Sequence, residues 1–181
     1  MRELSLHILD LIENSIRAGA SSIAVTVEER PDKDSMTIAV EDNGPGLSVS
    51  FEKAVDPFYT TKEGKRTGLG LSLFKAAAEQ ANGSMTLGKS ALGGLAVEAK
   101  MQLSHIDRYP LGDLAATLSS VVCTNPDLDL SVRIASSGGD CDVRVTDIAN
   151  EFCAHDRCGL AIARRVSERV KKALTAVSVH G

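Results

Sequence analysis

The chain has 181 residues, of which 43% are apolar and 24% charged, so fibrous and disordered classes are excluded. A net charge of −4, with four Phe, two Tyr and no Trp, argues against a protein that clamps or stacks nucleic acid. No apolar run approaches the ~20 residues of a membrane span. Asp10 and Glu13 interrupt the stretch that a signal peptide would need to be apolar. We therefore expect a cytoplasmic protein that binds neither nucleic acid nor membrane.

The first predicted element is an amphipathic helix over residues 3–18. Apolar residues repeat at helical spacing on one side, and the other side is expected to carry Glu3, His7, Asp10, Asn14 and Arg17. Gly19 is a natural end for this helix. Two strands follow at 21–30 and 35–42, with the turn residues PDKD between them.

A glycine-punctuated turn, DNGPG, ends the second strand at residues 42–46. We expect a short helical stretch near 49–55, a polar segment over 59–68 and a helix over 69–81. Asn82 and Gly83 close that helix, because both residue types tolerate the left-handed conformation. Strands near 84–89 and 94–103 then complete a first unit, residues 1–104.

From residue 105 the pattern restarts with a helix predicted over 111–123. Strands are predicted over 128–136 and 141–149, and a last helix over 157–177. This helix has a basic face, which is most simply solvated. Its apolar stripe packs on its own core or pairs with a second chain as a homodimer. The stripe consists of Leu160, Ala163, Val166, Val170, Leu174 and Val177. Residues 105–181 are thus a small α/β extension whose role the sequence does not identify.

Four cysteines, Cys123, Cys141, Cys153 and Cys158, fall in the last third of the chain. Without a secretory signal they are expected to stay reduced. Cys153, His155 and Cys158 are the nearest approach to a metal cluster, but they lack the paired spacing of a zinc site. Buried free thiols are the simpler interpretation.

The chemistry is carried by four signals in a fixed order: Asp10 and Asn14 at i, i+4 on the first helix, DNGPG after a strand, a basic polar loop, and Gly-Leu-Gly opening a helix. Each alone is explained by a solvated face, a turn, an exposed loop or a helix entry. No G-x-G-x-x-G sequence occurs, which excludes an ordinary Rossmann site. Residues 83–90, GSMTLGKS, fit the pattern G-x-x-x-x-G-K-[ST], but they run along the strand predicted at 84–89 and no helix is predicted directly after them, so an ordinary P-loop is excluded as well.

In this order and spacing the signals resemble the GHKL nucleotide-binding superfamily, most of all the catalytic domain of sensor histidine kinases. LDLIENSIRAGAS resembles the asparagine box, EDNGPGL the first glycine box and DPFYTTK the phenylalanine box, while TGLGLSLFKAAAEQANGSM resembles the second glycine box. GGLAVEAKMQL resembles the closing glycine and last strand. The resemblance covers about residues 3–103. It implies an α+β fold: a two-layer α/β sandwich of the Bergerat type, with a mixed sheet and helices on one face.

The resemblance also implies residue roles in binding ATP and Mg²⁺. Asp42 would accept a hydrogen bond from the adenine amino group, and Gly44 and Gly46 would leave room for the purine. Asn14 would bind Mg²⁺ through its amide oxygen. The phosphates would lie against the second glycine box and the preceding loop, where backbone N–H groups, hydroxyls and a lysine favour anions. The residues concerned are Thr60, Thr61, Lys62, Gly68, Leu69, Gly70 and Leu71.

Asp10 occupies the position where gyrase-like members carry a catalytic Glu and typical histidine kinases carry Asn. It is a candidate catalytic base, one methylene shorter than Glu. Two other roles for Asp10 remain open: it could support the Mg²⁺ site, or it could be an ordinary solvated residue on the polar face of the helix.

The resemblance suggests three functions: a kinase module that phosphorylates a partner protein, an ATP-driven switch of the gyrase or MutL kind, or a non-catalytic ATP sensor. The chain begins at the asparagine box, so we expect the acceptor histidine of a sensor kinase to come from elsewhere. Residues 104–111 resemble a phosphoacceptor box around His105, but Ile106 stands where an acidic residue is usual. An ordinary linker with a surface histidine is the preferred interpretation.

Overall fold

The computed structural model describes residues 3–46, 69–152, 159–177 and 179. The first part of the chain contains α1 (Leu4–Arg17), β1 (Ser22–Arg30), the 3₁₀ turn η1 (Pro31–Lys33), β2 (Ser35–Asp42), α3 (Leu69–Gln80), β3 (Ser84–Lys89) and β4 (Leu95–Gln102). The second part contains α4 (Leu114–Thr124), β5 (Asp129–Ser136), β6 (Gly139–Arg144), α5 (Val145–Asn150) and α6 (Gly159–Ala176).

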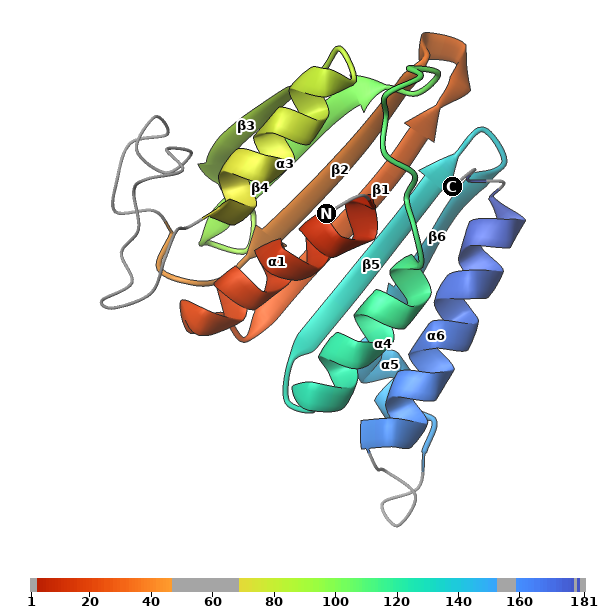
Figure 1. Ribbon diagram of the computed structural model, residues 1–181. Helices are drawn as coiled ribbons and strands as arrows, with labels where there is room; N and C mark the ends of the chain where they lie inside the picture. The colour runs from red at the N-terminus through yellow and green to blue at the C-terminus, as the bar shows by residue number, and fades with distance from the viewer. Residues whose placement is uncertain (1–2, 47–68, 153–158, 178, 180–181) are drawn as a thin grey trace.

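The described strands form one sheet in the order β3-β4-β2-β1-β5-β6. The β1–β5 pair is parallel and the other neighbours are antiparallel, so the sheet is mixed. Helices α1, α3, α4 and α6 cover one face (Figure 1). This two-layer α+β sandwich confirms the predicted fold class.

The core lies between the sheet and its helices, because the strands alternate in burial. In β1 every second side chain from Ile23 to Val27 is buried against the helices, whereas the residues between them are only half-buried. Phe74 of α3 and Leu118 of α4 are fully buried on the same side. The alternation fixes the strand register, since a slip of one residue would turn the apolar set toward solvent.

The part of the chain after residue 104 continues the same sheet. Residues 22–28 of β1 pair with residues 129–135 of β5. The linker before α4 also holds the start of α1, where the N–H groups of Leu4 and Ser5 donate to the carbonyls of Pro110 and Leu111 at 2.9 and 2.8 Å. These bonds satisfy helix donors that have no intrahelical acceptor.

Two boundaries predicted in this part are wrong. The helix predicted over 111–123 begins at Leu114, because Gly112 has a positive φ of 76° and the Asp113 side chain caps the helix by accepting from Ala116 N at 2.8 Å. The strand predicted over 141–149 ends at Arg144 and continues as α5. Val145 and Ile148, buried three residues apart, fit one face of a helix and not an alternating strand.

The stripe predicted on α6 is partly wrong. Leu160 is 72% exposed, whereas Ile162 and Ala173 are buried beside Val166 and Val170. None of the helices in the described ranges is both long and apolar enough to cross a membrane.

Candidate nucleotide-binding site

The site is organised around the carboxylate of Asp42, which ends β2 and is only 4% exposed. Its Oδ1 accepts from the backbone N–H groups of Gly44 at 2.9 Å and Leu95 at 3.0 Å. Its Oδ2 accepts from the hydroxyl of Ser15 at 2.6 Å. A carboxylate oxygen accepts about two hydrogen bonds, so within the described part of the chain Oδ1 has its full number and Oδ2 has room for one further donor.

Glycines allow the chain to approach this carboxylate closely. A Cβ at Gly94 would overlap Asp42 Oδ1 and the backbone of Gly44. A Cβ at Gly44 would stand 3.2 Å from the same oxygen. Gly46 has a φ of 75°, a backbone conformation that residues other than glycine rarely adopt. Gly44 and Gly46 are sequence-predicted site residues that the structure places next to Asp42.

The neighbours of Asp42 fix the end of β2. Asn43 Oδ1 accepts from the N–H groups of Ser21 and Ser22 at 2.9 and 3.0 Å. Glu41 Oε2 accepts from Ser90 Oγ at 3.1 Å and from Ala91 N at 3.0 Å. These contacts join the loop before β1 and the turn before β4 to the site. Nothing local in the sequence identifies them, because each partner is at least 20 residues away.

A second group of predicted residues gathers where α1 meets the beginning of α3. Asp10 and Asn14 lie one turn apart on α1. A Cβ at Gly70 would overlap the Asp10 carboxylate and come within 3.3 Å of Asn14 Nδ2. The first turn of α3, with Leu69, Gly70 and Leu71, therefore begins beside both side chains. The N–H groups of a first turn have no intrahelical acceptor, so they favour an anion there.

The oxygen donors at this place fit a hard cation such as Mg²⁺, which takes one or two protein oxygens and completes its shell with phosphates and water. Asn14 Oδ1 accepts from Arg17 Nη1 at 3.2 Å, and its Nδ2 faces Gly70. Rotation of the amide by about 180° would present the oxygen toward α3 and release Arg17. The described residues contain no group of three or more His, Cys, Asp or Glu able to hold a metal by itself.

The prediction that His7 lies on the polar side of α1 is wrong, since only 2% of this residue is exposed. Its ring stacks on Phe74 and Tyr109, with centroids 5.5 and 6.3 Å away. Within the described residues neither ring nitrogen has a hydrogen-bond partner. Burial lowers the pKa of His7 from 6.5 to about 4.

Several predicted residues lie outside the described residues: Thr60, Thr61, Lys62 and Gly68 of the loop, and Cys153, His155 and Cys158 of the weak metal cluster. The predicted helical stretch at 49–55 lies outside them too. Of the two cysteines that are described, Cys123 is exposed and Cys141 partly so, and both are free. The interpretation as buried thiols is therefore wrong for Cys123.

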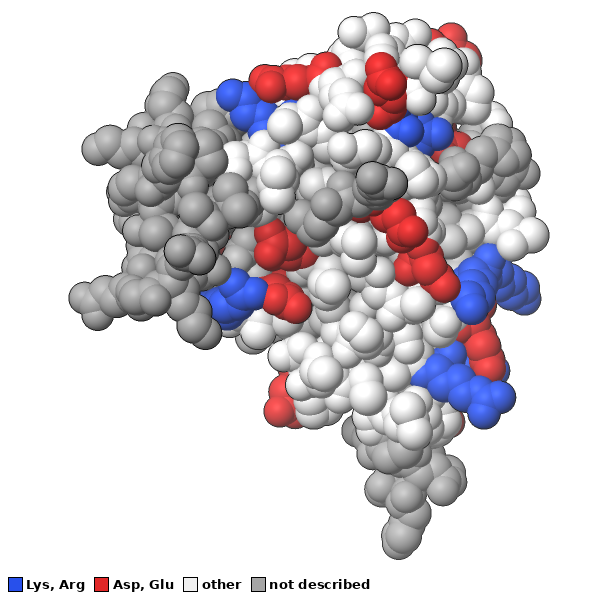
Figure 2. Space-filling model, viewed as in Figure 1, with Lys and Arg blue, Asp and Glu red and all other residues white. Residues whose placement is uncertain are grey.

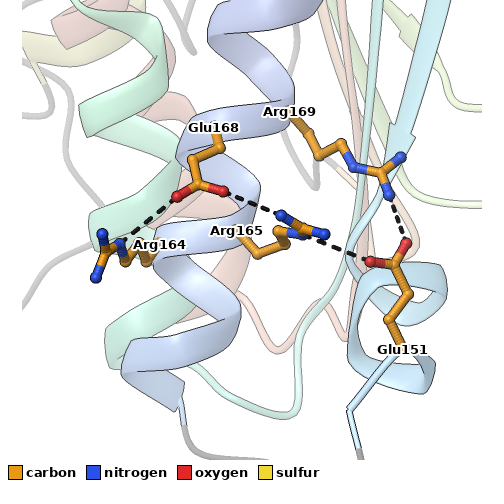
Figure 3. Close-up of polar contacts among 5 residues, drawn as sticks. All are labelled: Glu151, Arg164, Arg165, Glu168 and Arg169. Atoms are coloured by element: carbon orange, nitrogen blue, oxygen red, sulfur yellow. Dashed lines mark hydrogen bonds and ion pairs between the residues drawn. The ribbon is translucent and has the colours of Figure 1, made fainter.

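The arginines of α6 are paired with acidic side chains (Figure 3). Glu151 contacts Arg165 at 3.6 Å and Arg169 at 2.6 Å. Glu168 contacts Arg164 at 3.6 Å and Arg165 at 3.2 Å. In Figure 2 basic and acidic side chains accordingly alternate over α6. This surface is a mixed-charge face, in agreement with the solvated interpretation.

Comparison with known proteins identifies the family. Residues 2–105 match the model of the histidine kinase-, DNA gyrase B- and HSP90-like ATPases, which is more than half of the chain. The chain therefore belongs to this family, and residues 2–105 are its ATP-binding, histidine kinase-like domain.

The sensor histidine kinase CpxA of Escherichia coli strain K12 is 37% identical over 92 residues, which cover 48% of this chain and 20% of that protein. The sensor histidine kinase SpaK of Bacillus subtilis is 29% identical over 103 residues, which cover 54% and 22%. The chain thus spans about a fifth of the length of these relatives. The catalytic domain of histidine kinase ThkA is 25% identical, with a TM-score of 0.46 over 57% of this chain and 68% of that one.

Proposed function

We propose that the chain binds ATP together with Mg²⁺ and transfers the γ-phosphoryl group to a partner protein. The observation that carries this proposal is that α1 contacts both ends of the candidate site. Ser15 holds Asp42 at one end, and Asp10 and Asn14 meet Gly70 at the other. Relatives named as sensor histidine kinases support a kinase more than a switch.

At the base end, Asp42 Oδ2 accepts from Ser15 alone among the described residues, and its second acceptor position suits the 6-amino group of adenine. Guanine carries a carbonyl oxygen at that place, so two acceptors would face each other. In the proposed complex the purine ring lies beside Gly44 and Gly46, neither of which carries a side chain.

At the phosphate end, the first turn of α3 offers backbone N–H groups and the positive end of a helix dipole. Asn14 and Asp10 supply oxygens for Mg²⁺, which balances phosphate charge when bound. The place of Asp10 beside Gly70 supports a role in metal support or in accepting the nucleophile's proton. This position argues against the interpretation of Asp10 as an ordinary solvated residue on the helix face.

The acceptor is proposed to be another protein because His105 lies in a turn, at the opposite end of β2 from the base end of the site. Ser104, its neighbour, donates to Asp34 just before β2, whereas Asp42 ends β2. Seven residue steps of about 3.3 Å separate the ends of β2 by about 23 Å. His105 itself lies in a turn, where its Nδ1 accepts from Asp107 N at 3.2 Å, and not on a helix. A homodimer stays a prediction.

The test is incubation of the chain with γ-labelled ATP, alone and with a cell extract, beside the variant Asn14→Ala. In the proposed step the bond between the β,γ-bridging oxygen and the γ-phosphorus breaks, and the acceptor forms a bond to phosphorus and loses a proton. We expect a labelled second protein with the parent chain and none with Asn14→Ala.

Each other outcome contradicts the transfer. Label released only as inorganic phosphate would indicate an ATPase switch. Bound but unconverted ATP would indicate a sensor. Acid-labile label on the chain itself, absent in His105→Ala, would indicate self-phosphorylation.

A further inference from the structure

We infer that Ser15 determines base specificity by positioning the acceptor carboxylate of Asp42, an inference that rests on the proposed ATP-binding function. Ser15 lies on α1, is 7% exposed, and donates through Oγ to Asp42 Oδ2 at 2.6 Å. At helical spacing it falls on the apolar arc of α1, beside the buried Leu11 and Ile12.

The direction of this hydrogen bond is unusual for a serine within a helix. Such hydroxyls commonly donate to the carbonyl oxygen four residues earlier. The hydroxyl of Ser15 is instead bonded to a residue 27 positions later, on another element. A buried hydroxyl is costly unless it is bonded, and an apolar residue would suit the arc as well. The bond to Asp42 therefore accounts for serine at this position.

Ser15 completes a three-point attachment of the carboxylate. The N–H groups of Gly44 and Leu95 hold Oδ1, and Ser15 is the donor to Oδ2 among the residues that the structure describes. Oδ2 is the oxygen with a position left for the base. Ser15 therefore sets the direction in which that remaining position points.

The Ser15 hydroxyl also determines whether the base faces hydrogen-bond donors or acceptors. Ser15 has a single hydroxyl proton, and it is committed to Asp42. The pair consequently offers the base acceptors and no donor, which suits the 6-amino group of adenine and opposes the 6-carbonyl of guanine. In Ser15→Ala, a water replacing the hydroxyl would carry two protons, one for Asp42 and one for a carbonyl oxygen.

The test compares nucleotide affinities by calorimetry for the parent chain, Ser15→Ala and Ser15→Thr. The probes are ATP, GTP and purine riboside triphosphate, which lacks the 6-amino group. We expect Ser15→Ala to weaken the affinity for ATP about tenfold and to change the affinity for purine riboside triphosphate less than twofold. The ratio of the ATP affinity to the GTP affinity should therefore become smaller. Ser15→Thr keeps a hydroxyl and should retain the parent's preference. Ser5→Ala, which changes a buried serine on the same helix away from the site, is the matched control.

Equal weakening of ATP and purine riboside triphosphate in Ser15→Ala would overturn the inference, because it would show a merely structural role. Unchanged affinity for ATP would overturn it as well. A parent chain that binds none of the three nucleotides would contradict the proposed function itself, an outcome distinct from both.

Discussion

Helix α1 buries two polar side chains in different ways. The Ser15 hydroxyl is bonded to a carboxylate, so its burial is compensated and it contributes to the site. The His7 imidazole is buried between Phe74 and Tyr109 without a hydrogen-bond partner among the described residues. Burial disfavours the charged form of His7, so between about pH 4 and pH 6.5 the folded chain keeps it neutral and its protonation accompanies unfolding.

This arrangement predicts a loss of stability in acid. The pKa of His7 is about 4 in the folded chain, below its ordinary value of 6.5. Between these values the unfolded chain binds a proton that the folded chain does not, so the free energy of unfolding falls as the pH drops from 6.5 to 4. The contribution of His7 to this fall is about 3 kcal/mol.

Denaturant unfolding at pH 7 and pH 4.5 measures the effect, with His7→Leu as the variant that cannot titrate. Leucine is similar in size and apolar, so it suits the same stacked site. The variant should lose clearly less stability than the parent over this range. The same loss in both proteins would show that other groups cause the acid sensitivity.

At the scale of elements, the end of β2 and the turn before β4 form one unit. Glu41 accepts hydrogen bonds from Ser90 and Ala91 of this turn, and Asp42 accepts one from Leu95, the first residue of β4. Gly94 N also donates to the Asp42 carbonyl at 3.0 Å. The turn thus belongs to the base end of the site, although it is about 50 residues from Asp42 in the sequence.

Gly94→Ala is expected to damage both folding and binding. Gly94 is not among the glycines with positive φ, so the substitution acts only through the overlap of its Cβ with Asp42 and Gly44. We expect a loss of about 2 kcal/mol in the free energy of unfolding and at least tenfold weaker ATP binding. Gly88→Ala, on the neighbouring β3 with nothing within 4 Å of its Cβ, is the control and should stay within about 0.5 kcal/mol of the parent. Equal effects of both substitutions would contradict this role of the turn.

The sequence predicts the site residues on α1 and β2 because their spacing is local. Asp10 and Asn14 follow one helix face, and Gly44 and Gly46 follow the strand that ends in Asp42. Ser15, Leu95 and Gly94 are missed as partners of Asp42, since their contacts depend on tertiary packing. The alternation that predicts a strand over 141–149 holds only as far as Val145, where α5 begins and the next buried side chain is Ile148. His7 is covered by Tyr109 from a linker, which no pattern within α1 could indicate.

At the scale of the whole molecule, the sheet joins the ATP-binding part to the extension. The linker carbonyls at Pro110 and Leu111 bond the first turn of α1, the helix that carries Asp10, Asn14 and Ser15. Helix α4 also packs on α1, and β5 extends the sheet beside β1. The extension therefore supports the helix on which the site depends.

A chain cut to residues 1–104 is expected to be poorly soluble, because β1 would lose its partner strand and α1 its packing against α4. The full chain should unfold in a single transition, since both parts share one sheet. Circular dichroism melting and the soluble fraction of the two chains measure these effects. A soluble 1–104 chain with the melting temperature of the full chain would contradict this dependence.

The most direct test of the account is calorimetric titration of ATP and GTP into the parent chain and Asp42→Asn. The parent is expected to bind ATP in preference to GTP. Asp42→Asn is expected to lose ATP binding while its circular dichroism spectrum is unchanged, because the carboxylate that accepts the adenine amino group is gone. Undiminished ATP binding by Asp42→Asn would contradict the assignment of the base site.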